Sequence, residues 1–185
     1  VERGEDVHAA TAAEVVGASE GKVSPGERSK AKMVNYGIAY GLSAYGLADR
    51  LNIEHEEAAA YIERYFERFP KVKAYIDETI SFARENGYVT TLLGRRRPIP
   101  ELRSGNPNTR RLGERLAVNT VIQGTAADII KVAMVRCHDA LATAGLETRV
   151  ILQIHDELLF EGPEAEADAV ADLARREMAD AFELD

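Results

Sequence analysis

Residues 24–41, SPGERSKAKMVNYGIAYG, carry a complete set of helix signals. Ser24 is a preferred N-cap residue, Pro25 suits the first helical position, and Glu27 completes a capping-box pattern three residues after the cap. At the other end, Gly41 is well suited to the position just past a helix C-terminus. The stretch therefore predicts a helix over 25–40.

One face of this predicted helix carries two cations followed by two aromatic rings. Arg28, Lys32, Tyr36 and Tyr40 are spaced by four residues, so they drift only about 120° around the axis over roughly 18 Å. Such a face suits a ligand with a polyphosphate at one end and flat rings at the other, and the helix N-terminus adds attraction for anions. On spacing alone, a solvated face with both tyrosines packed on a neighbouring element remains open.

The remaining elements are predicted to be mostly helices, with a small sheet in the last third. A strand is expected over 87–93, a turn over 94–98 and a loop over 98–107. Two short strands are expected within 148–161, meeting at His155-Asp156. Further helices are expected over 7–16 with Asp6 as N-cap, 43–51, 55–68, 70–83, 109–144 with a break or kink near Gln123-Gly124, and 163–182. The sequence therefore predicts a mostly helical α+β fold with a small antiparallel hairpin.

The composition excludes several protein classes. The chain has 185 residues, 45% of them hydrophobic and 29% charged, which is typical of an ordinary globular protein and not of a disordered, collagen-like or coiled-coil chain. The single Cys137 cannot form an internal disulfide or a Cys-rich zinc site, so a reducing cytoplasm is expected. No apolar run approaches the ~20 residues needed to span a bilayer, and no signal peptide pattern opens the chain.

The net charge of −8 argues at first against a nucleic-acid partner. However, a polyanion meets the local charge. The window 94–115 holds seven arginines and two acids, a balance of +5, whereas 156–185 holds eleven acids and two arginines, a balance of −9. Only the middle of the chain suits a phosphate backbone. Within it, the turn Arg95-Arg96-Arg97 is either a phosphate contact or a solvated cluster.

A second motif is Arg115-x3-Asn119-x3-Gln123, followed by Gly124-Thr125-Ala126-Ala127-Asp128. Its three polar residues place hydrogen-bond donors on one helix face. Because the DNA minor groove presents acceptors at similar positions in every correct pair, such donors test pair geometry and not sequence. Gly124 permits a close backbone approach. The alternative is that Asn119 and Gln123 cap a helix break; Asp128 is interpreted as a structural residue, such as a helix cap, in preference to a metal ligand.

A third motif, Gln153-Ile154-His155-Asp156-Glu157, carries a polar trio at a junction between two apolar stretches. Carboxylates there can hold Mg²⁺, which prefers oxygen ligands and substrate phosphates. Taken alone, such a trio is more often a solvated hairpin tip, and a histidine such as His8 on a short helix is an ordinary surface residue.

In their order and spacing, these motifs resemble family A DNA polymerases of the bacterial DNA polymerase I type. Arg28-x3-Lys32-x7-Tyr40-Gly41 is similar to the nucleotide-binding helix of the family's fingers. The resemblance implies that Arg28 and Lys32 hold the triphosphate of an incoming nucleotide, that Tyr36 packs on its sugar, and that Tyr40 lies where the templating base enters. Asp6-Val7-His8-Ala9-Ala10-Thr11-Ala12 resembles a family pattern in which the histidine assists the triphosphate.

The other two motifs resemble the family's DNA contacts and its palm. Arg115, Asn119 and Gln123 would touch the minor-groove side of primer–template DNA. Asp156 would bind catalytic metal, Glu157 would support it, and His155 would approach the primer terminus. The implied activity is template-directed DNA synthesis in replication and repair, in which two Mg²⁺ ions assist addition of a deoxynucleoside triphosphate to a primer 3′-hydroxyl. The catalytic residues expected are Lys32, Asp156 and Glu157.

The resemblance covers essentially the whole chain but not the whole enzyme. The family's other metal-binding aspartate belongs to an Asp-Tyr-Ser-Gln-x-Glu motif, which is absent here and would precede Val1. We expect residues 1–111 to be the fingers and 112–185 a truncated C-terminal part of the palm, inactive alone. The expected partners are primer–template DNA and deoxynucleoside triphosphates. We expect a monomer without membrane contact, associated with the nucleoid in the bacterial cytoplasm.

Three other functions stay open at this point. A non-catalytic nucleic-acid or nucleotide-binding module would explain the missing half of the metal site. A metal-dependent hydrolase could use His155, Asp156 and Glu157, although it lacks a second ligand cluster. A single-subunit RNA polymerase shares parts of the fingers helix, but the run Gln-Gly-Thr-Ala-Ala-Asp at 123–128 favours the DNA enzyme.

Overall fold

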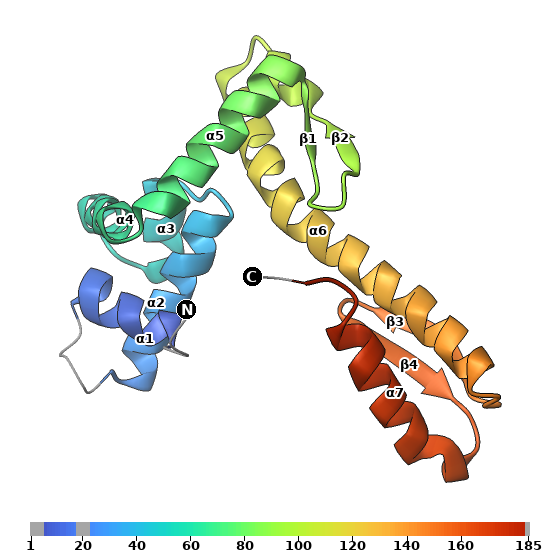
Figure 1. Cartoon of the computed structure of the whole chain (residues 1–185). Helices are drawn as coiled ribbons and strands as arrows, with labels where there is room; N and C mark the ends of the chain where they lie inside the picture. The colour runs from blue at the N-terminus through green and yellow to red at the C-terminus, as the bar shows by residue number, and fades with distance from the viewer. Residues whose placement is uncertain (1–5, 18–22, 184–185) are drawn as a thin grey trace. The chain divides into compact units, whose positions relative to one another are not determined.

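The computed structural model describes residues 6–17 and 23–183. Contacts along the chain divide it into two compact units (Figure 1). The first unit comprises residues 1–89 and 96–119, and the second comprises 90–95 and 120–185. The boundary between the two units therefore falls within one long helix.

The first unit is helical apart from two short strands. Its elements are α1 (Val7–Thr11), a π-helical turn (Ala12–Val16), α2 (Pro25–Ala39), α3 (Ala44–Leu51), α4 (His55–Arg68), α5 (Pro70–Asn86), β1 (Tyr88–Thr90), β2 (Arg96–Pro98), a 3-10 turn (Pro100–Arg103) and the first part of α6 (Pro107–Thr143). The predicted helices are all present. The predicted strand over 87–93 is shorter, because the chain turns at Gly94 with φ 85° and Arg96–Pro98, expected to be a turn, pairs back as β2.

Helix α2 begins and ends as its sequence predicts. The Glu27 N–H donates to the Ser24 hydroxyl (3.2 Å), and the Glu27 carboxylate accepts from the Ser24 N–H (2.8 Å). At the C-terminus, Gly41 has φ 70°, its N–H bonds the Ile38 carbonyl (2.9 Å), and the next N–H bonds the Gly37 carbonyl (2.8 Å). These bonds form a Schellman motif, which satisfies carbonyls at the end of the helix.

The core of the first unit lies on the other side of α2 from the cations. Val34 and Ile38 are buried among Val15, Leu47 and Tyr61, which come from the π-helical turn, α3 and α4. Burying a side chain of this size contributes roughly 1.5–3 kcal/mol. The helical periodicity that places Val34 and Ile38 in the core leaves the opposite face of α2 outside it. This outer face carries the predicted ligand residues.

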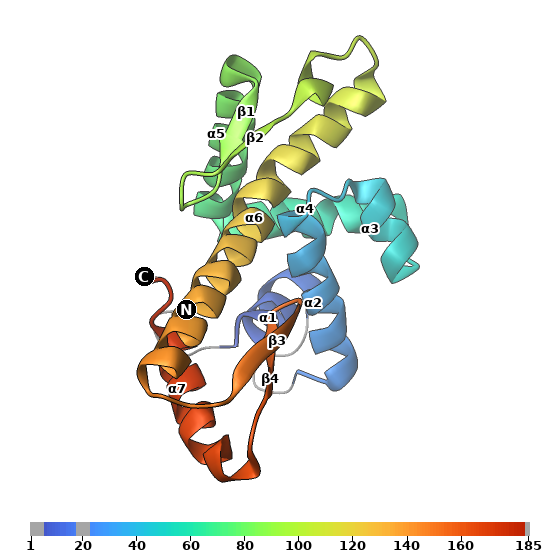
Figure 2. The same cartoon turned by 90° about the vertical axis from the view of Figure 1, so that its right-hand side faces the viewer.

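The second unit joins the rest of α6 to a hairpin and a final helix, which lie side by side in Figures 1 and 2. Strands β3 (Arg149–Ile154) and β4 (Glu157–Glu161) are antiparallel, and a register shift lies between Val150 and Leu152. A 3-10 turn (Glu164–Glu166) leads into α7 (Ala167–Ala179), which starts later than predicted. The core is Leu141, Val170 and Leu173, packed against Leu146, Val150 and Phe160.

Of the break or kink predicted near Gln123-Gly124, the break is wrong, because α6 runs unbroken from Pro107 to Thr143. Gly124 serves close packing instead: a Cβ at this position would lie 2.8 Å from Cγ2 of Thr91. The helix ends near the predicted place, at Thr143, and the chain turns away at Gly145 with φ 67°. No helix in the described ranges is both long enough and apolar enough to cross a membrane.

Gly162 provides a test of packing in the second unit. A Cβ there would lie 2.7 Å from the Cα of Thr148 and closer still to its side chain, while Glu166 holds Thr148 through the backbone N–H (3.0 Å) and the hydroxyl (2.6 Å). Because Thr148 cannot yield, Gly162→Ala should lower the free energy of unfolding by about 1–3 kcal/mol. Guanidinium denaturation followed by circular dichroism measures it.

The matched control is Gly105→Ala, because a Cβ at Gly105 would meet no heavy atom within 4 Å. This surface change should stay within about 0.5 kcal/mol of wild type. Equal stability of the two variants would contradict the packing argument for Gly162.

Candidate functional site

The exposed face of α2 carries the four residues that the spacing predicted. Arg28, Lys32, Tyr36 and Tyr40 are all exposed. The Tyr36 and Tyr40 rings are stacked with centroids 6.2 Å apart, and the Lys32 ammonium lies 5.8 Å from the centroid of Tyr36. Charge and flat aromatic surface are therefore adjacent on one side of the helix.

Helix α1 brings His8 to the same surface. The His8 ring lies 5.8 Å from the ring of Tyr36, and its Nδ1 atom is 2.8 Å from the amide nitrogen of Asn35. The Thr11 hydroxyl lies 3.0 Å from the amide oxygen of Asn35, which is buried. Sequence reasoning missed Asn35. The signal available was a polar residue at the helical spacing of the core positions Ala31, Val34 and Ile38.

Arg28 is paired with Asp6, the N-cap residue of α1. Its Nε donates to Oδ2 of Asp6 at 2.8 Å, and both side chains are about half exposed (49% and 44%). The hydrogen bond from Arg28 lowers the pKa of the Asp6 carboxyl, and bonds from the backbone N–H groups of His8 and Ala9 lower it further. Because the pKa of Asp6 is lower in the folded than in the unfolded state, its ionised carboxylate stabilises the fold at pH values above the unfolded-state pKa. This stabilisation is lost as the pH falls through the folded-state pKa. An anionic ligand of Arg28 would compete with Asp6.

Within the first unit, Arg115 packs beside the end of α2. A Cβ on Gly41 would lie only 2.8 Å from Cγ of Arg115, so the first and second motifs meet at this glycine. Asn119, one turn further along α6, has a buried side-chain oxygen without a hydrogen-bond partner among the described residues. Because α6 is continuous, the alternative that Asn119 and Gln123 cap a helix break is wrong.

In the second unit, the last residue of this motif meets the hairpin turn. Gln123 and Lys131 of α6 line a pocket of about 300 Å³ together with Gln153, His155 and Asp156. His155 has φ 54°, a left-handed conformation that costs roughly 1–2 kcal/mol outside glycine. Its carbonyl accepts a hydrogen bond from the Gln153 side chain at 2.5 Å. The turn therefore presents His155 and Asp156 toward the pocket from a strained, two-residue connection.

The hairpin turn offers oxygen ligands for a divalent cation. Asp156 and the adjacent Glu157 are both exposed, and carboxylates are ligands that Mg²⁺ prefers. Within residues 6–17 and 23–183, however, no three His, Cys, Asp or Glu side chains gather as a metal site would require. The donors of this chain thus fit one part of a Mg²⁺ coordination shell. Among the described residues, the donors do not form the second ligand cluster that a hydrolase built on this trio would need.

Asp128 lies in the middle of α6, so a role as a helix cap is wrong. Its side chain is only 10% exposed and forms an ion pair with Arg95, Nε to Oδ1 at 2.7 Å. Arg95 is therefore not a freely solvated member of the arginine turn.

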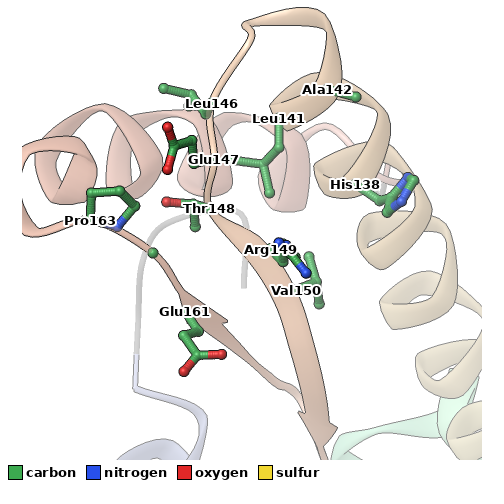
Figure 3. Close-up of a pocket in the computed structure, with 11 residues that line it drawn as sticks. His138, Leu141, Ala142, Leu146, Glu147, Thr148, Arg149, Val150, Glu161 and Pro163 are labelled. Carbon is green, nitrogen blue, oxygen red and sulfur yellow. The ribbon is translucent and has the colours of Figure 1, made fainter.

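A larger pocket, of about 790 Å³, lies at the other end of the hairpin, where β3 begins and β4 ends (Figure 3). Its polar lining includes His138, Glu147, Arg149 and Glu161. None of the residues predicted for a functional site lines it.

Comparisons with known proteins agree with the motifs. The profile of DNA polymerase family A matches residues 1–185. The chain is 50% identical over 179 residues to DNA polymerase I of Caldicellulosiruptor bescii, covering 97% of the chain and 21% of that protein. It is 46% identical over 183 residues to the thermostable DNA polymerase I of Thermus thermophilus, covering 99% and 22%. The chain thus spans about a fifth of the length of these curated relatives.

A solved structure is similar over nearly the whole chain. It is the polymerase domain of Pol1 from M. smegmatis, in a complex with DNA primer-template and dNTP. The TM-score is 0.90 at 47% identity, and the match covers 98% of this chain and 32% of that one. With a family profile that matches from the first residue to the last, the chain belongs to DNA polymerase family A.

Proposed function

We propose that this chain supplies the nucleotide-binding helix and part of the catalytic centre of a template-directed DNA polymerase. The observation that carries the proposal is the gathering of His8, Lys32 and Tyr36 on one surface, although His8 comes from a different helix. Sequence spacing along α2 accounts for Lys32 and Tyr36, but only packing of α1 on α2 adds the histidine.

On this surface the proposed ligand is the incoming deoxynucleoside triphosphate. Arg28, Lys32 and His8 would hold its phosphates, helped by the N-terminus of α2. Such preorganised charges stabilise the negative charge that develops as pyrophosphate leaves. Tyr36 would pack on the sugar, and Tyr40 would lie at the entry of the templating base.

The second and third motifs would act on primer–template DNA. Donors from Arg115, Asn119 and Gln123 would probe the minor groove, where correct pairs present acceptors at similar positions. His155 would approach the primer terminus, Asp156 would bind metal, and Glu157 would support it. When bound, two Mg²⁺ ions would supply electrostatic stabilisation of the attacking and leaving oxygens. The pocket that joins Gln123 to His155 and Asp156 supports this placement.

The two compact units support an assignment of fingers to residues 1–111 and palm to residues 112–185. The contacts put the boundary slightly later, after Asn119, and group 90–95 with the second unit. The primer-template and dNTP in the complex of the M. smegmatis relative support DNA and nucleotides as partners. We further propose a monomer that acts on the chromosome in the bacterial cytoplasm.

A non-catalytic binding module is the second candidate function. The observation that favours it is that the described residues form no complete metal-binding group. Primer extension by the full-length protein separates the two functions, because a binding module would retain DNA without elongating it.

Lys32→Ala in the full-length protein tests the nucleotide site. The change removes one cation that faces the triphosphate, so transition-state stabilisation should fall by about 2–4 kcal/mol, the scale for one lost electrostatic donor. Steady-state primer extension measures this loss as kcat/KM for the nucleotide. The control is Lys30→Ala, which removes an exposed lysine from another side of α2. If kcat/KM of Lys32→Ala stays within threefold of wild type, Lys32 is an exposed lysine without a role in nucleotide binding.

Tyr36→Phe tests the role of the exposed tyrosine. A phenol, unlike a phenyl ring, can replace the hydrogen bond that the nucleotide's own 3′-hydroxyl makes, so Tyr36 should make the enzyme tolerant of 2′,3′-dideoxynucleotides. Because an unpaired polar group costs about 1–3 kcal/mol, Tyr36→Phe should increase discrimination against them by roughly 5- to 150-fold. Competition between a dideoxynucleotide and its normal counterpart measures the ratio.

Tyr45→Phe is the matched control for this experiment. Tyr45 is 74% exposed on α3, so loss of its hydroxyl should leave the incorporation ratio unchanged. Equal ratios for wild type and Tyr36→Phe would leave the Tyr36 hydroxyl without a role.

A further inference from the structure

The turn between β1 and β2 is fastened to α6 at several points. The Arg95 guanidinium donates from Nε to Asp128 (2.7 Å) and from Nη2 to the carbonyl of Gly124 (3.1 Å). The Leu92 N–H donates to the Thr125 hydroxyl at 3.0 Å. Thr91 packs into the space that a Cβ on Gly124 would fill. All of these residues belong to the second unit.

The ion pair between Arg95 and Asp128 involves a buried carboxylate. Asp128 is 10% exposed at its side chain, whereas Arg95 is 52% exposed. The second carboxylate oxygen of Asp128 is buried and finds no hydrogen-bond partner in the described part of the chain. Arg95 therefore compensates a buried charge, and its planar guanidinium does so while also reaching the Gly124 carbonyl. A lysine has one point charge and no such fork.

A different side of the same stretch of α6 faces the turn between β3 and β4. Gln123, Ala127 and Lys131 line the pocket shared with His155 and Asp156, whereas Gly124, Thr125 and Asp128 contact the turn. Successive residues of a helix are rotated by 100°, so these two sets lie on different sides. The turn between β1 and β2 thus supports the segment of α6 that carries Gln123.

We propose that Arg95 is a positioning residue, which fixes the Gln123 segment of α6 relative to the hairpin turn, and that it does not bind DNA phosphate. The proposal rests on the proposed function, in which Gln123 contacts primer–template DNA. Displacement of a substrate-positioning group by about 1 Å can cost on the order of 100-fold in rate. Arg95 would therefore influence catalysis through Gln123 without touching the substrate.

The test compares Arg95→Lys, Gln123→Ala and their combination in the full-length protein. Arg95→Lys keeps the positive charge but loses the two-point contact. A second variant, Arg95→Gln with Asp128→Asn, removes both charges together, so no buried carboxylate is left unpaired if Arg95→Lys fails to fold. Arg175→Lys is the matched control, because Arg175 also pairs with an aspartate but both side chains are largely exposed (76% and 79%).

Three quantities are measured: kcat/KM for extension of a matched primer, the salt dependence of primer–template binding, and the melting curve. We expect Arg95→Lys to lower kcat/KM about fivefold or more, on the scale of one lost hydrogen bond. The combined variant should be no worse than the poorer single variant within about twofold, since residues that act as one unit are not additive. The logarithmic salt slope of the Arg95→Gln, Asp128→Asn variant, which has lost the arginine cation, should stay at its wild-type value.

Three results would overturn the proposal. A residue bound to a duplex phosphate contributes about 0.9 to the salt slope, so a fall of that size in the Arg95→Gln, Asp128→Asn variant, which lacks the cation, would make Arg95 a DNA contact. Defects of Arg95→Lys and Gln123→Ala that multiply in the combined variant, or full activity of Arg95→Lys beside a defective Gln123→Ala, would make the two residues independent. Failure of the wild-type protein to extend a primer would instead refute the proposed function itself.

Discussion

Burial of one side of α2 is the interaction on which the first unit depends. Val34 and Ile38 enter the core that α3, α4 and the π-helical turn complete, and the 100° rotation per residue then leaves Lys32 and Tyr36 on the outside. The capping box and the Schellman motif hold both ends of the helix. The surface for a ligand is thus a consequence of the core, because a helix that buries one stripe must present the opposite one.

Two glycines allow close packing against α6. Gly41 admits the aliphatic part of Arg115, and Gly124 admits Thr91. A methyl group at either place would lie 2.8 Å from a neighbouring carbon, well inside van der Waals contact. Inside a helix, a glycine such as Gly124 lowers the helix propensity of the chain. In the folded chain the two glycines are the places where α2 meets α6 and where the arginine turn rests on it.

Charge in this protein is organised locally. The chain carries −8 overall, yet its cations gather along one face of α2 and in the stretch from the arginine turn to Arg115. Several of them already have anionic partners, since Arg28 pairs with Asp6 and Arg95 pairs with Asp128. The two pairs differ in burial of the acid. The half-exposed Asp6 can be displaced by a competing anion, whereas the buried Asp128 ties its arginine to the fold.

Capping signals, helical periodicity and motif spacing are local properties of the chain, and from them the sequence predicts most of the helices, the caps of α1 and α2, the β3–β4 hairpin and the family. It also placed Lys32 and Tyr36 on one face of α2. Only the tertiary structure decided which residues meet from different elements. Hydrogen bonds among Thr11, Asn35 and His8 hold the His8 ring beside Tyr36. The turn between β1 and β2 packs on Gly124, so a glycine that was expected to break α6 instead allows a close contact with this turn. The reason is that such contacts depend on the distance between surfaces, which no local pattern encodes.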